Sequence, residues 1–246
     1  MSIKLEICCG SLDDVINAKA GGADRVELNS ALFLGGLTPS MGLAREAKKI
    51  GIPIMAMVRP RDGGFCYTEK EFQCMLNDVF DFAVLGIEGL VFGVLNADGT
   101  VDSVRCAQLV KAAGDRLKVF HRAFDVVPDW KKTMDELIEL GFDRILTSGQ
   151  RANSIEGAAT LKEMIAYADG RIEILPAGGI RPNNVKELIE ISGCNQIHAS
   201  AGSKYKDSSC IGNPNVHFGS SVDMPEGEFS VTDIEKVRSL KSAIKI

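Results

Sequence analysis

The stretch Lys-Val-Phe-His-Arg-Ala-Phe-Asp at residues 118–125 passes from a short apolar run into a histidine, an arginine and an aspartate. A buried strand has no reason to end in His121, Arg122 and Asp125 unless that end faces water or a ligand. The same change ends five other runs: Leu5–Cys8, Val26–Asn29, Val58–Arg61, Ile145–Ser148 and Ile197–Ser200. Polar side chains therefore collect where the predicted strands end.

Eight strand-like runs are spaced along the chain, with a helical pattern between each pair. They begin near Lys4, Arg25, Pro53, Gly89, Lys118, Arg144, Glu173 and Gln196. Eight such βα units predict an α/β fold, the (β/α)8 TIM barrel. An open doubly wound sheet is the alternative, but the expected Gly-x-Gly-x-x-Gly is missing after the first strand, where the chain has Cys8-Cys9-Gly10-Ser11.

The length and composition fit one domain. The chain has 246 residues, 45% of them hydrophobic and 25% charged, and a barrel of this kind commonly needs roughly 250 residues. We expect a single domain over residues 1–246, with strand and helix repeats at 1–200, a mouth-covering loop at 201–230 and a closing helix at 231–246. Thr68 with Glu71, and Thr232 with Glu235, each predict a capping box at a helix start.

The net charge limits which partners we expect the protein to bind, and the cysteine pattern limits which cross-links or zinc sites we expect. The net charge of −5 and the absence of a Lys/Arg run argue against nucleic acid or a membrane surface as the main partner. The first residues lack the pattern of a signal peptide, so we expect a cytoplasmic protein. Seven cysteines without a Cys-x-x-Cys motif indicate neither a disulfide framework nor a zinc knuckle.

Strand alternation suggests which polar residues point into the barrel. Glu6 and Cys8 share one face of their strand, and Cys9 points the other way. Glu27 and Arg59 are expected nearby, so two carboxylates beside a guanidinium can tune a general acid or base, or form a structural salt-bridge network. His121 is a candidate proton carrier or metal ligand. Glu6, Glu27 and His121 are thus the candidate catalytic residues.

A second group of residues suits a small anion, and for an enzyme this class includes phosphorylated metabolites. Arg59 and Arg61 flank a proline before a glycine-rich turn, and arginine suits a carboxylate or phosphate. Gly178 and Gly179 follow the seventh strand and can present backbone N–H groups, although tight turns use glycine as well. The other candidate binding residues at strand ends are Ser148, His198 and Ser200. Arg122 and Asp125 are expected to form an ion pair that braces their loop.

The sequence also contains thiol and imidazole side chains, which are typical ligands of copper and other soft metal ions. Cys8, Cys66, His121 and His198 can converge at the barrel mouth, although no local spacing announces a site. Cys8 and Cys66 are the candidate metal ligands. The positions of the lysines argue against a Schiff-base aldolase. Such an enzyme needs a lysine inside the barrel near its top, and none is expected there.

Several longer motifs resemble those of the CutC family over essentially the full chain. They are Leu5–Cys8, Gly22–Leu28, Gly35–Ser40, Val58–Arg61, Phe120–Asp125 and Leu146–Gly149. The resemblance implies a cytoplasmic (β/α)8 barrel, usually a homo-oligomer (a dimer or tetramer), with a role in copper homeostasis. Many members have cysteines at the ends of strands one and two that have been considered as copper ligands. This chain has Cys8 at the first position and Asn29 at the second.

Two functions follow from these observations, and a third stays open. The first is binding of Cu(I), through Cys8 with Cys66 or a histidine. The second is metal-independent acid/base catalysis on a small anionic metabolite, with Arg59 and Arg61 holding the anion. The third is a regulatory barrel that senses a ligand without turnover. Fold alone does not choose among them.

Overall fold

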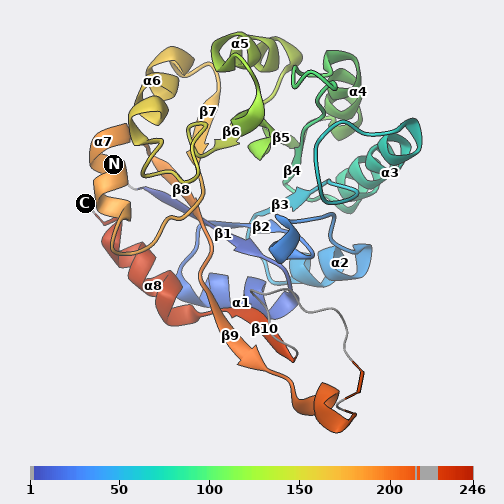
Figure 1. Ribbon diagram of the computed structural model, residues 1–246, viewed down its shortest axis with the longest axis vertical. Coiled ribbons are helices and arrows are strands. Elements are labelled where there is room, and N and C mark those ends of the chain that lie inside the picture. The colour runs from blue at the N-terminus through green and yellow to red at the C-terminus, as the bar shows by residue number, and fades with distance from the viewer. Residues whose placement is uncertain (1–2, 214, 217–226, 246) are drawn as a thin grey trace.

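The computed structural model describes residues 3–213, 215–216 and 227–245. Within them, eight parallel strands surround a central axis and helices cover the outside (Figure 1). The barrel strands are β1 (Lys4–Cys9), β2 (Arg25–Leu28), β3 (Ile54–Met57), β4 (Gly89–Phe92), β5 (Leu117–Phe120), β6 (Arg144–Thr147), β7 (Glu173–Pro176) and β8 (Gln196–Ala199). The α-helices are α1 (Leu12–Gly21), α2 (Met41–Lys49), α3 (Glu69–Leu85), α4 (Ser103–Ala113), α5 (Trp130–Leu140), α6 (Ala158–Ala168), α7 (Val185–Ser192) and α8 (Ile234–Ala243).

Strand order shows a nearly closed barrel. The hydrogen-bonded order runs from β7 through β6, β5, β4, β3, β2 and β1 to β8, with every neighbouring pair parallel. A single bridge between Ala177 and His198 joins β7 to β8. The single-domain (β/α)8 barrel predicted from the sequence is therefore confirmed. None of the helices in the described residues is long and apolar enough to cross a membrane.

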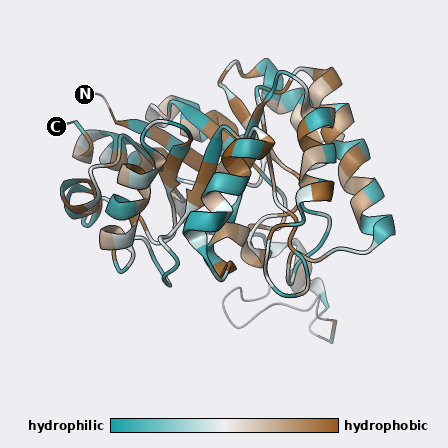
Figure 2. Cartoon of the chain, turned by 90° about the horizontal axis from the view of Figure 1, so that it is seen from above, coloured by the Kyte–Doolittle hydropathy of each residue, from teal (hydrophilic) through white to brown (hydrophobic). Residues whose placement is uncertain are grey.

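Alternation along the strands separates two cores. Leu5, Ile7 and Cys9 of β1 join the large cluster between the strands and the helices. A smaller cluster fills the barrel interior with Met55, Met57, Val91, Val119, Leu146, Leu175 and Ala177. The helices carry both hydrophilic and hydrophobic stretches, as expected for elements with one buried face (Figure 2). Glu6 and Cys8 belong to the other face of β1, so both lie on the inner side.

Two predicted capping boxes have different outcomes. The Thr68 hydroxyl accepts from the Glu71 backbone, and the Glu71 side chain accepts from the Thr68 backbone, so the box at α3 is confirmed. The prediction at Thr232 is wrong, because Asp233 caps α8 and its carboxylate accepts from the Glu235 and Lys236 backbones. The Thr232 N–H instead donates to Asp14 Oδ1 at 2.5 Å.

The segment after β8, expected as a mouth-covering loop, contains regular secondary structure in its described residues. β9 (Gly202–Lys206) and β10 (Glu228–Thr232) pair as an antiparallel ribbon, and the 3₁₀ helix η3 (Ser208–Gly212) follows β9. The ribbon extends away from the barrel before the chain returns to α8 (Figure 1). Residues 214 and 217–226, which belong to the predicted cover, lie outside the described residues.

Candidate functional site

A cavity of about 740 Å³ opens at the carboxyl ends of the barrel strands. Its polar lining comes from the barrel strand ends and the segments that follow them, from α1 and from the segment Glu228–Thr232: Cys8, Ser11, Asp14, Glu27, Arg59, His121, Arg122, His198, Ser200, Ser230 and Thr232. Its apolar lining includes Leu32, Phe33, Leu34, Met57, Phe65, Leu146 and Phe229. Parallel strands place their carboxyl ends at one rim, which is why residues distant in sequence meet here.

A buried ionic network lies under the cavity. Glu6 is paired with Arg25 of β2 on one side, and its Oε1 lies 2.7 Å from His198 Nδ1 of β8 on the other. Arg25 also donates to Gln196 Oε1 at 2.7 Å. The β1 register explains the contacts, because Glu6 is aligned with Arg25 on one neighbouring strand and with His198 on the other.

The network lowers the pKa of Glu6 and raises the pKa of His198. Burial raises the pKa of Glu6, but the hydrogen bonds and charges of His198 and Arg25 outweigh it and lower the pKa to about 2. Burial likewise lowers the pKa of His198, but the charge of Glu27 and the hydrogen bond to Glu6 outweigh it, so the pKa is raised. At neutral pH Glu6 is therefore ionised, and His198 is more readily protonated than a free imidazole.

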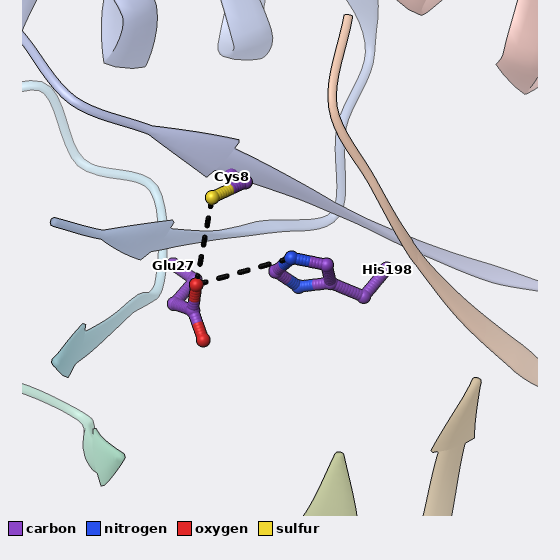
Figure 3. A group of neighbouring side chains, drawn as sticks. All are labelled: Cys8, Glu27 and His198. Carbon is purple, nitrogen blue, oxygen red and sulfur yellow. Dashed lines mark hydrogen bonds and ion pairs between the residues drawn. The ribbon is translucent and has the colours of Figure 1, made fainter. Parts of the chain in front are cut away.

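Cys8, Glu27 and His198 form a compact cluster above this network. The Glu27 carboxylate lies between the other two side chains, with Oε2 at 3.6 Å from Cys8 Sγ and 3.8 Å from His198 Nε2 (Figure 3). Asn29 Nδ2 donates to Glu27 Oε2 at 2.8 Å and to Cys8 Sγ at 3.4 Å. The amide of Asn29 therefore presents its hydrogen-bond donors to this cluster.

The pKa of two groups in the cluster is raised. Burial, followed by the charge of Glu27, raises the pKa of the Cys8 thiol well above its usual range. Burial also raises the pKa of Glu27, although His198 opposes that shift. Among the described residues, Glu27 Oε1 has no hydrogen-bond partner. Glu27 is thus a buried carboxyl group, shifted toward proton uptake, at the edge of the cavity.

His121 and Arg59 line the cavity on another side. His121 Nδ1 accepts from the Ala123 backbone at 3.3 Å, which leaves Nε2 to carry the ring proton. Burial, with the nearby charge of Arg59, lowers the pKa of His121 to about 3, so this ring is neutral at pH 7. In the described part of the chain, His121 Nε2 and Arg59 Nε have no hydrogen-bond partner. Both are buried donors beside the cavity.

Arg59 also forms hydrogen bonds that hold the loops around the opening of the cavity. Its Nη1 donates to the carbonyls of Leu34 at 2.8 Å and Gly36 at 3.1 Å, and its Nη2 donates to that of Gly63 at 2.9 Å. The guanidinium lies 5.4 Å from the Phe65 ring centre. The expected contact between Arg59 and the two glutamates does not appear among these bonds, because its Nη1 and Nη2 donate to loop carbonyls.

Six of the predicted site residues line this cavity: Cys8, Glu27, Arg59, His121, His198 and Ser200. The others lie elsewhere. Glu6 lies beneath His198, Arg61 pairs with Glu71 at 2.6 Å, and Cys66 is exposed outside the lining. Ser148 is buried against Asp125, and Gly178 and Gly179 lie outside the lining.

Arg122 has two roles in the structure. The expected ion pair with Asp125 is present at 2.7 Å, and Nη2 also donates to Ser148 Oγ at 2.8 Å. Asp125 accepts in addition from the backbones of Ser148 and Gln150. Arg122 nevertheless lines the cavity, so it adds a positive charge to the site as well as bracing its loop.

Sequence reasoning missed two parts of the site. The partner of Glu6 is Arg25, although the alternation of Arg25 with Glu27 on one strand was a usable signal that both point inward. The second is the apolar mouth, formed by the 3₁₀ helix η1 (Leu32–Leu34) and by Phe229 of β10. The apolar run before Gly35-Gly36 marked η1, whereas no signal placed Phe229 at the mouth.

These features define a class: a (β/α)8 barrel protein with an ionised network beneath a mixed polar and apolar cavity. The model of the CutC family matches residues 3–203. The chain is 48% identical over 237 residues to a CutC family protein of Treponema denticola, covering 96% of each chain. It is 40% identical over 242 residues to the human copper homeostasis protein cutC homolog, covering 98% of this chain and 89% of the relative.

A solved structure agrees with these sequence matches. The crystal structure of CutC from Streptococcus agalactiae superposes with a TM-score of 0.76 at 36% identity, over 80% of this chain and 97% of that one. This chain belongs to the CutC family. The copper homeostasis name is carried by relatives, so the chemistry of this chain has to be argued from its own cavity.

Proposed function

We propose that this protein is an enzyme that binds a small oxyanion-bearing metabolite in the cavity and moves a proton on it. One observation carries the proposal: residues lining one cavity hold buried donors and a buried acceptor without partners. The donors are His121 Nε2 and Arg59 Nε, and the acceptor is Glu27 Oε1, all among the described residues. Unpaired buried polar groups are costly, by about 1–3 kcal/mol each, and a catalytic role is one of the reasons that native proteins retain them.

The anion side of the cavity consists of His121, Arg59 and Arg122. Neutral His121 donates through Nε2 and does not act as a proton carrier near neutral pH, because its pKa is lowered to about 3. The two guanidinium groups supply positive charge, and Arg59 is already fixed by three carbonyl contacts. A carboxylate or phosphate oxygen of the ligand satisfies these donors.

The proton side consists of Glu27 and His198. Glu27 takes a proton from a hydroxyl or an activated C–H of the substrate, and His198 donates one from Nε2. The proton on Glu27 then passes to His198, whose Nε2 lies 3.8 Å from Glu27 Oε2, and both residues return to their starting forms. Glu6 does not touch the cavity. It is a positioning residue, because its hydrogen bond to Nδ1 holds the imidazole and favours its charged form. This assignment moves the proton-carrier role from His121 to His198.

The test is a metabolite screen in D2O. Small carboxylated and phosphorylated metabolites are incubated with the protein, and mass spectrometry follows loss, mass change or deuterium uptake. We expect one metabolite to react, and Glu27→Gln to slow it by about 100-fold or more. Glu46→Gln is the control, because Glu46 pairs with Lys49 on the exposed surface. A reaction that runs equally fast in Glu27→Gln contradicts the proposal.

The cluster of Cys8, Glu27 and His198 favours a second candidate, binding of copper. One ligand atom from each of the three lies within 4.8 Å of the others. Cu(I) prefers sulfur and nitrogen donors, so the fitting ligands are Cys8 Sγ and His198, while the Glu27 oxygen is a harder donor. Asn29 donates its N–H groups to the same atoms, so it does not replace a second cysteine. Binding requires loss of the Cys8 proton.

Copper binding is tested by Cu(I) uptake against a competing chelator. Retention of about one equivalent in the wild type, lost in Cys8→Ser and kept in Cys66→Ser, supports a site in the cavity. Cys66 is the matched control because its side chain is exposed outside the cavity lining. Uptake that is unchanged in Cys8→Ser and His198→Gln contradicts this candidate.

A further inference from the structure

The cavity is larger than the binding of a single ion requires. Its volume is about 740 Å³, and pockets for small organic molecules commonly measure about 300–1,000 Å³. An inorganic anion or a metal ion on the polar residues would leave most of this space to solvent. Glu27, Arg59, His121 and His198 lie at the strand ends of the barrel, whereas much of the remaining lining is apolar.

Exposed apolar side chains gather at the mouth. Phe33 is 65% exposed, Phe229 44%, Leu32 37% and Leu34 36%, and all four line the cavity. Single exposed apolar residues are common on soluble proteins, but a group of them around one opening marks a binding surface. They come from η1 and from β10, segments far apart in the sequence. The mouth therefore presents an apolar surface that is continuous with the polar floor.

The loop that carries η1 is anchored in this exposed position. Ser30 and Leu37 close its base with two backbone hydrogen bonds of 2.8 and 2.9 Å, and Arg59 holds the Leu34 carbonyl at 2.8 Å. Ala31 has a φ of 46°, a left-handed conformation that costs a non-glycine residue roughly 1–2 kcal/mol. Such strain persists where the surrounding structure imposes it, often at ligand sites.

The ribbon side of the mouth is anchored as well. Asp14 accepts from the Thr232 backbone of β10 at 2.5 Å and from the Gly10 backbone at 2.8 Å, which ties the end of β10 to the loop after β1. Within the ribbon, the Phe229 ring lies 6.1 Å from that of Tyr205. Both halves of the mouth are thus fixed relative to the donors below.

We propose that the ligand of this cavity is amphiphilic, with an oxyanion held near Arg59, His121 and Arg122 and an aromatic ring or short alkyl group held between η1 and Phe229. The inference rests on the proposed function, since it names the substrate class of the same site. In this inference the apolar mouth binds the apolar part of the small ligand. Contact between two copies of the chain is the competing use of that surface.

Matched pairs of probes test this division of the cavity. Binding of methylphosphonate and phenylphosphonate, and of acetate and phenylacetate, is measured by calorimetry on the full chain. For the pair that binds, we expect the phenyl compound to bind at least tenfold more tightly, and Phe33→Ala combined with Phe229→Ala to reduce the ratio below about threefold. Affinity for the small member of the pair stays unchanged. Phe80→Ala is the control, since Phe80 is 60% exposed on α3 and outside the cavity.

The outcomes separate the two proposals. If the small and phenyl members bind equally, the apolar inference fails while oxyanion binding stands. If none of the four probes binds, the oxyanion site and the inference fail together. If the double substitution changes the oligomeric state in size-exclusion chromatography and leaves the affinity ratio intact, the mouth is a contact between copies and the inference is overturned.

Discussion

Glu6 and His198 are 192 residues apart in sequence, yet Oε1 of the first lies 2.7 Å from Nδ1 of the second. The contact joins β1 to β8, the first and last barrel strands in the sequence, which pair directly. Arg25 holds Glu6 from the opposite side. The geometry of the site therefore depends on one buried carboxylate held between a guanidinium and an imidazole.

Removing the charge of Glu6 should destabilise the fold. Glu6→Gln leaves Arg25 buried without its anion, and breaking a buried ion pair in this way costs about 3–5 kcal/mol. Urea unfolding at pH 7 measures the change in the free energy of unfolding. Glu46→Gln, in an exposed pair with Lys49, should change little. A Glu6→Gln protein as stable as the wild type would show that the network contributes no net stability.

The same carboxylate should give a pH dependence below neutrality. The pKa of Glu6 is about 2 in the folded protein, below its usual value of 4.5. Its contribution is therefore fully present above pH 4.5 and is lost as the pH falls toward 2. The difference in the free energy of unfolding between the wild type and Glu6→Gln should shrink across that window. A difference that stays constant from pH 5 to pH 2.5 would contradict the lowered pKa.

The two histidines of the cavity should titrate very differently. The pKa of His198 is raised above 6.5, whereas burial and the charge of Arg59 lower that of His121 to about 3. In NMR spectra His198 should change protonation above pH 6.5, and His121 should stay neutral from pH 5 to 8. His198→Gln and His121→Gln assign the signals. Titration of His121 near pH 6.5 would remove its assigned role as a neutral donor.

Two glycines offer a matched test of the packing around Asn29. Gly36 has a φ of 86°, and a Cβ there would lie 2.3 Å from Asn29 Oδ1. Gly170 has a φ of 73°, and a Cβ there would have no atom of the described residues within 4 Å. Gly170→Ala should cost about 1 kcal/mol through backbone strain alone. Gly36→Ala should cost more in urea unfolding; equal costs would mean that Asn29 moves away freely.

The cysteines should differ in their reactivity toward alkylating reagents. The thiolate is the reactive form, and the raised pKa of Cys8 keeps this thiol protonated at pH 8. Cys66 and Cys74 are exposed, so iodoacetamide should modify them first. Peptide mass spectrometry follows each site over time. Glu27→Gln should speed the labelling of Cys8, because it removes a negative charge beside the sulfur, and an unchanged rate would argue against that coupling.

The sequence by itself determined the strands, their inner faces and most of the barrel. The period of two along β1 separated Glu6 and Cys8 from Cys9, and the polar strand ends indicated one shared rim. Local patterns are sufficient to predict which face of a strand a residue lies on, because strand alternation depends only on neighbouring residues. The capping box at Thr68 was predicted for the same reason.

Only the tertiary structure decided which residues are partners. Arg25, and not Arg59, pairs with Glu6, because the register of β1 with β2 aligns them while loop carbonyls occupy Arg59. The apolar mouth arises from η1 and Phe229, and Phe229 belongs to the strand β10 that pairs with β9. Pairing register and loop anchoring depend on contacts between residues far apart in the chain, and no local periodicity encodes them.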